Sequence, residues 1–229
     1  MKYIPSIAFE EMSGSAKGVT AAKVKSRKYI RNRGYGGSTR TAFQASVKAV
    51  FKQLSQAWKG LTNAQILAWN AAANTAEGRS VLGTKSKISG SNLFMRLNYW
   101  VVYCGGAIKT AVPTLAGVPT PEDATVVLTP AAMTFQLDDV PAESANLKLV
   151  ILASEPQGNG ITKAYSKAAA FDAPCNVTDE DIDIKAKYDA KYGAPSAGAP
   201  KVFFKYFFVN TVTGEKSGEK MVSAVLSNG

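Results

Sequence analysis

Residues 201–210, KVFFKYFFVN, decide how the C-terminal half of this chain folds. Because side chains alternate along a strand, they divide between two faces. One face carries Val202, Phe204, Tyr206 and Phe208, and the other carries Phe203, Lys205, Phe207 and Val209. Both faces are largely apolar. We therefore predict a strand that is central in its sheet, or one whose outer face meets a partner.

Further short strands are predicted around this segment. They cover residues 124–128, 134–137, 146–153 and 220–226, with proline- and glycine-containing turns between them. Residues 178–191, TDEDIDIKAKYDAK, predict a short helix that starts near Thr178 and crosses between two strands. Five or more short strands at this spacing predict an antiparallel immunoglobulin-like β-sandwich over residues 122–229.

Helices are predicted before the strands, over residues 39–104. Apolar residues recur at helical spacing from Phe43 to Trp58, with Ser38 or Thr39 as the N-cap and Gly60 at the end. Thr62 and Gln65 have the spacing of a capping box and begin a second helix.

A third helix is predicted from Leu93 to Tyr103, after a loop over residues 77–91. We expect Trp58 and Trp69 to pack across the helical hairpin, and the apolar stripes of all three helices to form a core. Residues 105–121, GGAIKTAVPTLAGVPTP, have the composition of a linker, or of an extended segment that lies on a partner. The predicted fold class is α+β.

Charge is divided along the chain. Residues 1–110 contain 17 Lys and Arg but three Asp and Glu, whereas residues 111–229 contain 10 and 14. The basic residues concentrate in residues 1–38, where like charges and glycines favour an extended basic arm that orders against a partner. The candidate docking residues are Lys23, Lys25, Arg27, Lys28, Arg31, Arg33, Tyr35 and Arg40. Three interpretations stay open: docking on an acidic protein subunit, binding of nucleic-acid phosphate, or a solvated tail.

Patterns that would indicate catalysis or a bound cofactor are missing from the sequence. Histidine is absent, which removes the commonest general base and metal ligand. The acidic run at residues 179–183 lacks the glycine and terminal glutamate of a calcium loop. Residues 34–39, GYGGST, lack the spacing of a phosphate-binding loop. We predict that the protein is not an enzyme and that it holds no cofactor or metal.

The two cysteines and the apolar runs give weaker indications. Cys104 and Cys175 are too few for a disulfide scaffold, and two reduced thiols are the simpler interpretation, although pairing stays open. The apolar runs are too short for a membrane span. The first residues lack the features of a signal peptide.

The order of several motifs resembles a group of uncharacterised structural proteins of tailed phages and prophages of gut bacteria. The recurring pattern is F-x6-W-x2-LT-x2-Q-x3-W-N, followed by G-x-NLF. It is matched here by Phe51, Trp58, Leu61-Thr62, Gln65, Trp69-Asn70 and residues 90–94. Residues 186–193 and 209–214 resemble the β domain of the same group. A common form of the arm has Asn-Pro where Gly37-Ser38 stand here, so the helix entry differs.

The resemblance implies a virion structural protein: a capsid accessory, head-to-tail connector or tail component. It would be made in the cytoplasm of the host bacterium and found in the virion. Its expected partners are other virion proteins, in a homo-oligomeric ring or symmetric array. The alternative is a nucleic-acid-binding protein that uses the basic arm.

Overall fold

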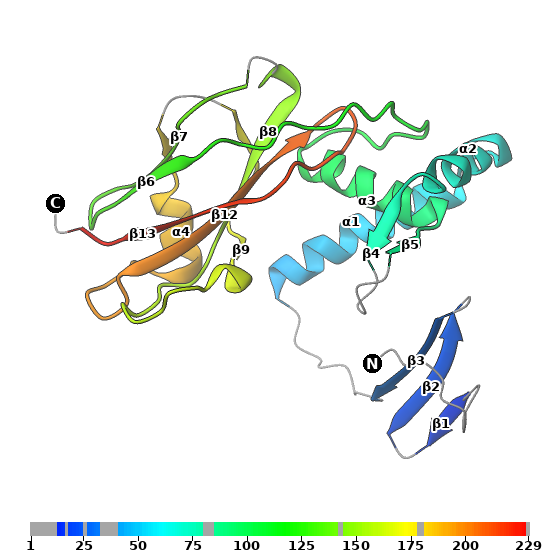
Figure 1. Cartoon of the computed structure of the whole chain (residues 1–229), viewed down its shortest axis with the longest axis horizontal. Helices are drawn as coiled ribbons and strands as arrows, with labels where there is room; N and C mark the ends of the chain where they lie inside the picture. The colour runs from blue at the N-terminus through cyan, green and yellow to red at the C-terminus, as the bar shows by residue number, and fades with distance from the viewer. Residues whose placement is uncertain are drawn as a thin grey trace.

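A computed structural model describes residues 13–16, 18–24, 27–32, 41–79, 85–141, 144–177 and 181–227. The fold is α+β, as predicted, and the strand pairs between named strands are antiparallel. In Figure 1 the helices α1 to α3 lie at one end of the main body and two β-sheets at the other.

Three helices form the helical part, and their ends follow from side-chain caps. Helix α1 (Ala42–Lys59) is capped by Thr41, whose hydroxyl accepts a hydrogen bond from the backbone N–H of Gln44 at 3.2 Å. The prediction of Ser38 or Thr39 as cap was therefore wrong, because the full capping box forms with Thr41. Helix α1 ends at Gly60, and helix α2 (Asn63–Ala73) starts from the predicted capping box of Thr62.

Helix α3 (Gly90–Tyr103) completes the helical core. Its Phe94 is fully buried and contacts both Trp58 and Trp69, with ring centroids 5.4 and 5.3 Å away. The two tryptophans were expected to pack on each other, but Phe94 lies against both. The predicted loop before α3 contains two short paired strands, β4 (Glu77–Arg79) and β5 (Lys85–Lys87).

The β part consists of two antiparallel sheets that face each other across a shared core. One has the order β11-β7-β6 (Ile182–Asp183, Met133–Leu137, Ala124–Leu128). The other has the order β10-β8-β12-β13 (Cys175–Asn176, Leu147–Ala153, Lys201–Asn210, Lys220–Val225). Strand β9 (Ala169–Ala170) pairs with the other end of β8. The five predicted strands are confirmed within a residue at each end.

Helix α4 (Lys185–Tyr192) begins later than predicted. Thr178 lies outside the described residues, and Ile182 and Asp183 pair with β7 as strand β11 instead of joining the helix. Pairing with β7 lets Ile182 pack against the core shared by the two sheets, beside the buried Ile184 and Tyr188. Core burial thus overrides the local helix signal.

Strand β12 is central and is covered on both faces. Its Phe204 and Tyr206 contact Phe135 of the opposite sheet, with ring centroids 6.4 and 5.1 Å apart. On the outer face, Phe207 meets Trp100 of α3 at 5.2 Å, and Phe203 meets Tyr165 at 5.0 Å. Side chains of this same chain therefore cover the outer face of β12, in place of the partner that the sequence left open.

The segment expected to be a linker, residues 105–121, is held by hydrogen bonds to both parts. The indole N–H of Trp69 donates to the carbonyl of Thr110 at 2.8 Å. Farther along, the backbone N–H groups of Ala116 and Gly117 donate to the carboxylate of Glu215 in the turn after β12. The segment therefore connects the helices to the sheets through fixed hydrogen bonds, and it is not the flexible linker that its composition predicted.

Candidate docking surfaces

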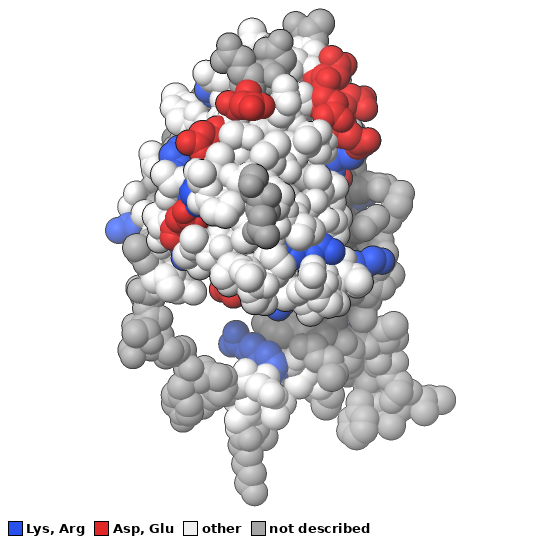
Figure 2. Space-filling view, turned by 90° about the vertical axis from the view of Figure 1, so that its left-hand side faces the viewer, with Lys and Arg blue, Asp and Glu red and all other residues white. Residues whose placement is uncertain are grey.

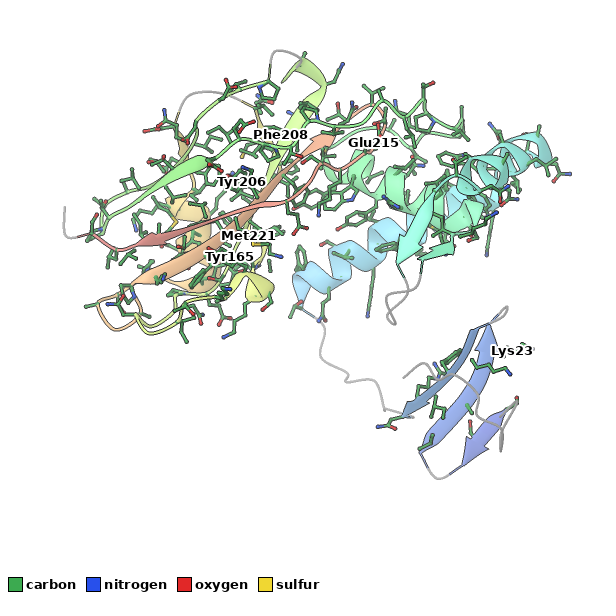
Figure 3. The ribbon with its side chains drawn as sticks, viewed as in Figure 1. Lys23, Tyr165, Tyr206, Phe208, Glu215 and Met221 are labelled. Carbon is green, nitrogen blue, oxygen red and sulfur yellow. The ribbon has the colours of Figure 1, made fainter. Side chains whose placement is uncertain are left out.

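Four of the eight predicted docking residues fall in a small sheet at the N-terminal end. Strands β1 (Gly14–Ala16), β2 (Val19–Val24) and β3 (Arg27–Asn32) pair in that order. Lys23 lies on β2 and is exposed, and Arg27, Lys28 and Arg31 lie on β3. Figure 3 shows Lys23 on its strand. The remaining candidates, Lys25, Arg33, Tyr35 and Arg40, lie outside the described residues.

The pairing register separates the basic residues of this sheet. Lys23 lies directly opposite Lys28, and Arg31 lies opposite Thr20, three positions farther along the paired strands. Because opposed residues share a face, Lys23 and Lys28 point to one side and Arg31 to the other. The sequence suggested one continuous basic arm, but the structure distributes its charge over two faces.

The prediction of an extended arm without internal partners also differs from the structure. The backbone between Gly14 and Asn32 is extended, yet its strands bond to one another. Val19, Tyr29 and Ile30 favour strands, and pairing satisfies backbone groups that an isolated arm would leave to water.

An apolar junction joins the helices to the outer face of the β8–β12 sheet. Trp100, Tyr103 and Cys104 pack against Val150 and Phe207, and the Tyr103 hydroxyl donates to the carbonyl of Asp172 at 3.3 Å. Burial raises the pKa of Tyr103 to about 12 and that of the Cys104 thiol to about 11. A thiol with so high a pKa is largely protonated and unreactive at neutral pH.

The turn that follows β12 packs against α3. Lys216 lies 3.9 Å from the ring centroid of Phe207, and its ammonium pairs with Glu219, which also pairs with Lys205 at 3.3 Å. The hydrogen bond from Lys216 lowers the pKa of Glu219. A pocket of about 500 Å³ opens here beside Arg96 and Trp100. Figure 3 labels Phe208 on β12 and Glu215 in the turn that follows it.

A second recess of about 500 Å³, which we term the aromatic groove, lies where α1, α3 and the β9–β10 edge approach one another. Its lining residues are Phe43, Tyr103, Ala170, Phe171, Asp172, Ala173, Pro174 and Lys191. The strand edge is interrupted there, because β9 and β10 both pair with β8 but residues 171–174 do not. The interruption leaves an open, mainly apolar surface beside the first turn of α1.

Several large apolar side chains are exposed on the helices, and two of them, Phe43 and Phe51, belong to the α1 stripe that was predicted to be core. Phe43 and Phe51 of α1 are 48% and 45% exposed, and Leu67 of α2 is 68% exposed. Leu54 of the same α1 stripe is fully buried. The α1 stripe is therefore longer than the core it covers, and its N-terminal half faces outward beside the aromatic groove.

The two thiols are free and lie on different sides of one sheet. Cys175 is paired opposite Leu149, which belongs to the core shared by the two sheets, whereas Cys104 packs on the outer face beside Val150. Within the described ranges, no group of three or more Cys, Asp or Glu side chains is placed to hold a metal ion. None of the helices in this part of the chain is both long and apolar enough to cross a membrane.

Charge on the β part differs from that of the N-terminal sheet. Figure 2 shows Asp and Glu side chains gathered in the upper part of one face, with Lys and Arg mostly toward its sides and lower edge. Burial and the nearby carboxylates of Asp123, Asp138 and Glu122 raise the pKa of Tyr206 to about 12. Burial of the hydroxyl is the larger cause of this shift, and the carboxylates add to it.

Comparison with known proteins gives no match: no family model, no curated protein and no solved structure is similar to this chain.

Proposed function

We propose that this chain is a structural component of a tailed-phage virion, a capsid accessory, head-to-tail connector or tail component, and not an enzyme. The observation that carries the proposal is the division into a small basic sheet and a body in which the helices pack on the β-sheets through an apolar junction. Assembly proteins use such a plan, because a rigid body keeps its orientation while a charged appendage holds a neighbour. The motif resemblance of residues 51–94 supports the same assignment.

The proposed partners are other virion proteins, including further copies of this chain in a ring or array. Lys23 and Lys28 on one face of the N-terminal sheet, and Arg31 on the other, would each meet an acidic surface of a neighbour, and the β part carries acidic residues of the matching sign. The proposed location is the virion, after synthesis in the cytoplasm of the host bacterium.

We further propose that the β part is an immunoglobulin-like sandwich. If its strands are lettered in chain order, β6, β7 and β8 are A, B and C, and β10 to β13 are C′, E, F and G. The observed orders then become E-B-A and C′-C-F-G. The immunoglobulin plan likewise places A, B and E in one sheet and C, F and G in the other. Such domains commonly serve as contact modules on assemblies.

A second candidate function is nucleic-acid binding by the N-terminal sheet. The observation that favours it is the direct opposition of Lys23 and Lys28, which presents two cations to one side. Phosphate binding by these residues would weaken steeply as salt concentration rises. Binding to an acidic protein surface would lack the slope set by released counterions along a nucleic acid.

The first test is mass spectrometry of purified phage particles, with the copy number of the protein per particle. Its presence in particles is the expected result, and its absence would overturn the structural assignment. Replacing Arg27 and Arg31 with alanine should abolish incorporation. The charge-matched control, Lys163→Ala with Lys167→Ala in the exposed part of the β region, should incorporate normally.

A further inference from the structure

The three helices of the helical part carry positive charge alone. Helices α1, α2 and α3 contain no Asp or Glu, and their cations are Lys48, Lys52, Lys59 and Arg96. The three lysines are spaced by four and seven residues, so they form one exposed stripe along α1, which we term the lysine stripe. Lys48 and Lys52 repel each other at this spacing, and no carboxylate of the described residues pairs with either. A negative surface laid on the stripe would relieve this repulsion.

The opposite charge gathers at one end of the β11-β7-β6 sheet. Residues 110–147 contain five Asp and Glu and no Lys or Arg. Four exposed carboxylates flank the start of β6 and the end of β7, and we term them the acidic end: Glu122, Asp123, Asp138 and Asp139. The backbone N–H of Asp138 donates to the carbonyl of Asp123 at 3.0 Å, so the carboxylates of the two strands lie side by side. Lys220 pairs with Asp123 at 2.8 Å, and within the described part of the chain no cation pairs with the other three.

Each charged surface also has an exposed apolar side chain near it. Phe51 is 45% exposed and lies one helical turn from Lys48. Val127 of β6 is 49% exposed and points away from the core that its neighbours Val126 and Leu128 cover. Protein interfaces combine apolar contact with a charged rim, so both surfaces have the composition of a docking face.

The two surfaces lie on opposite sides of β12 and do not meet within one chain. Helix α3 packs on the outer face of β12, where the rings of Trp100 and Phe207 are 5.2 Å apart. Strand β7 packs on the inner face, where Phe135 lies 5.1 Å from Tyr206. Figure 1 shows the helices on one side of β12 and β6 and β7 on the other. Complementary surfaces on different parts of one molecule join copies head to tail, in a closed ring or an open filament.

We propose that copies of this chain bind one another head to tail, with the lysine stripe of one copy against the acidic end of the next. The spacings match: lysines four residues apart on a helix have Cβ atoms about 5–6 Å apart. Opposed residues on paired strands such as Asp123 and Asp138 have Cβ atoms about 4.5–5.5 Å apart. Two lysines can therefore face two carboxylates at once. The contact rests on the proposed function, since it joins the copies of the ring or array proposed there.

The test is sedimentation velocity of the purified full-length chain over a range of protein concentrations, at about 50 mM and about 500 mM salt. We expect oligomers at the lower salt concentration that dissociate at the higher one, because salt screens exposed ion pairs. A chain that stays monomeric at the lower salt concentration would overturn the proposal.

Charge reversal identifies the two surfaces. Lys48→Glu with Lys52→Glu, and separately Glu122→Lys with Asp139→Lys, should each weaken self-association at least about tenfold, because like charges then face each other. An equimolar mixture of the two variants should associate again, because each altered surface meets the opposite charge on the other variant. Each variant alone is the control for the mixture, since mixing does not rescue a misfolded chain. Association that survives either reversal, or a mixture that stays monomeric, would contradict the head-to-tail contact.

Nucleic acid is the other polyanion that suits the lysine stripe. Oligonucleotide binding that is lost in Lys48→Glu with Lys52→Glu, by a chain that does not self-associate, would overturn the proposal in favour of nucleic acid. Mass spectrometry of particles tests the virion assignment separately. A monomeric chain that is found in particles would contradict the head-to-tail contact alone, and a self-associating chain that is absent from particles would contradict the virion assignment alone.

Discussion

Asn98 of α3 and Lys109 of the connecting segment are joined by two hydrogen bonds. The backbone N–H of Lys109 donates to the Asn98 Oδ1 at 2.6 Å, and the Asn98 Nδ2 donates to the carbonyl of Lys109 at 3.2 Å. The side chain is 1% exposed and also donates to the carbonyl of Phe94. One buried amide thus fixes a segment without regular structure to the helical core.

Replacing Asn98 with alanine should destabilise the fold. The change leaves the N–H and C=O of Lys109 without partners in a buried site, so the loss should be about 2–3 kcal/mol. The measurement is denaturant unfolding followed by circular dichroism. Asn92→Ala, at an exposed position of the same helix, is the control and should change stability by less than about 0.5 kcal/mol. Equal effects of the two substitutions would show that the buried hydrogen bonds contribute nothing.

Gly214→Ala should destabilise far more than Gly117→Ala. Both glycines have positive φ angles, +74° and +81°, so alanine costs about 1–2 kcal/mol of backbone strain at either position. A Cβ on Gly214 would also lie 2.1 Å from the carbonyl oxygen of Leu97 in α3, whereas one on Gly117 meets nothing within 4 Å.

The difference between these two variants therefore measures how closely the turn after β12 approaches α3. Thermal unfolding should show a markedly lower midpoint for Gly214→Ala than for Gly117→Ala. Similar midpoints would mean that the turn moves away from the helix at little cost, and that the junction is looser than the structure indicates.

The strands could be predicted closely because their signal is local. Alternation and turn residues placed 124–128 and 201–210 with the observed ends. Helix α4 was predicted too early, since the pairing of Ile182 with Phe135 depends on a strand more than 40 residues away. The α1 stripe was assigned wholly to the core, because sequence spacing shows that a face is apolar without showing how much of it is covered.

The candidate surfaces were less predictable than the fold. The basic residues were identified, but their division over two faces depends on the register of β2 with β3. The aromatic groove combines residues 43, 103, 170–174 and 191, which no sequence motif connects. The strongest available signal was the apolar outer face of β12, which indicated that something must cover it. Trp100, which helps to cover it, was assigned to the helical core as part of the apolar stripe of the third helix.

Tyrosine titration should begin late in the folded protein. Burial raises the pKa of Tyr103 and of Tyr206 to about 12. It also raises the pKa of Tyr188 well above the usual value. The folded state keeps these protons above pH 10, where the unfolded chain releases them, so folding stability should fall as pH rises from about 10 toward 12. Absorbance of phenolate near 295 nm measures the titration. Tyr206→Phe should remove one late-titrating group. A single transition of all tyrosines near pH 10 in the folded protein would contradict the burial.

Trp100→Ala should uncouple the helical part from the sheets. The ring packs edge-on against Phe207, with centroids 5.2 Å apart, and its removal opens the centre of the junction. The loss should be about 2–4 kcal/mol, somewhat less than for a fully buried tryptophan, since Trp100 is partly exposed.

Because the junction links two separate cores, the unaltered chain should unfold in one transition and the Trp100→Ala variant in two. Differential scanning calorimetry distinguishes these outcomes. Leu67→Ala, which removes an exposed side chain of α2, is the control and should keep a single transition. A single transition in Trp100→Ala as well would mean that the hydrogen bonds of residues 109–117 alone hold the two parts together, and the combined variant with Asn98→Ala would then be the one to separate them.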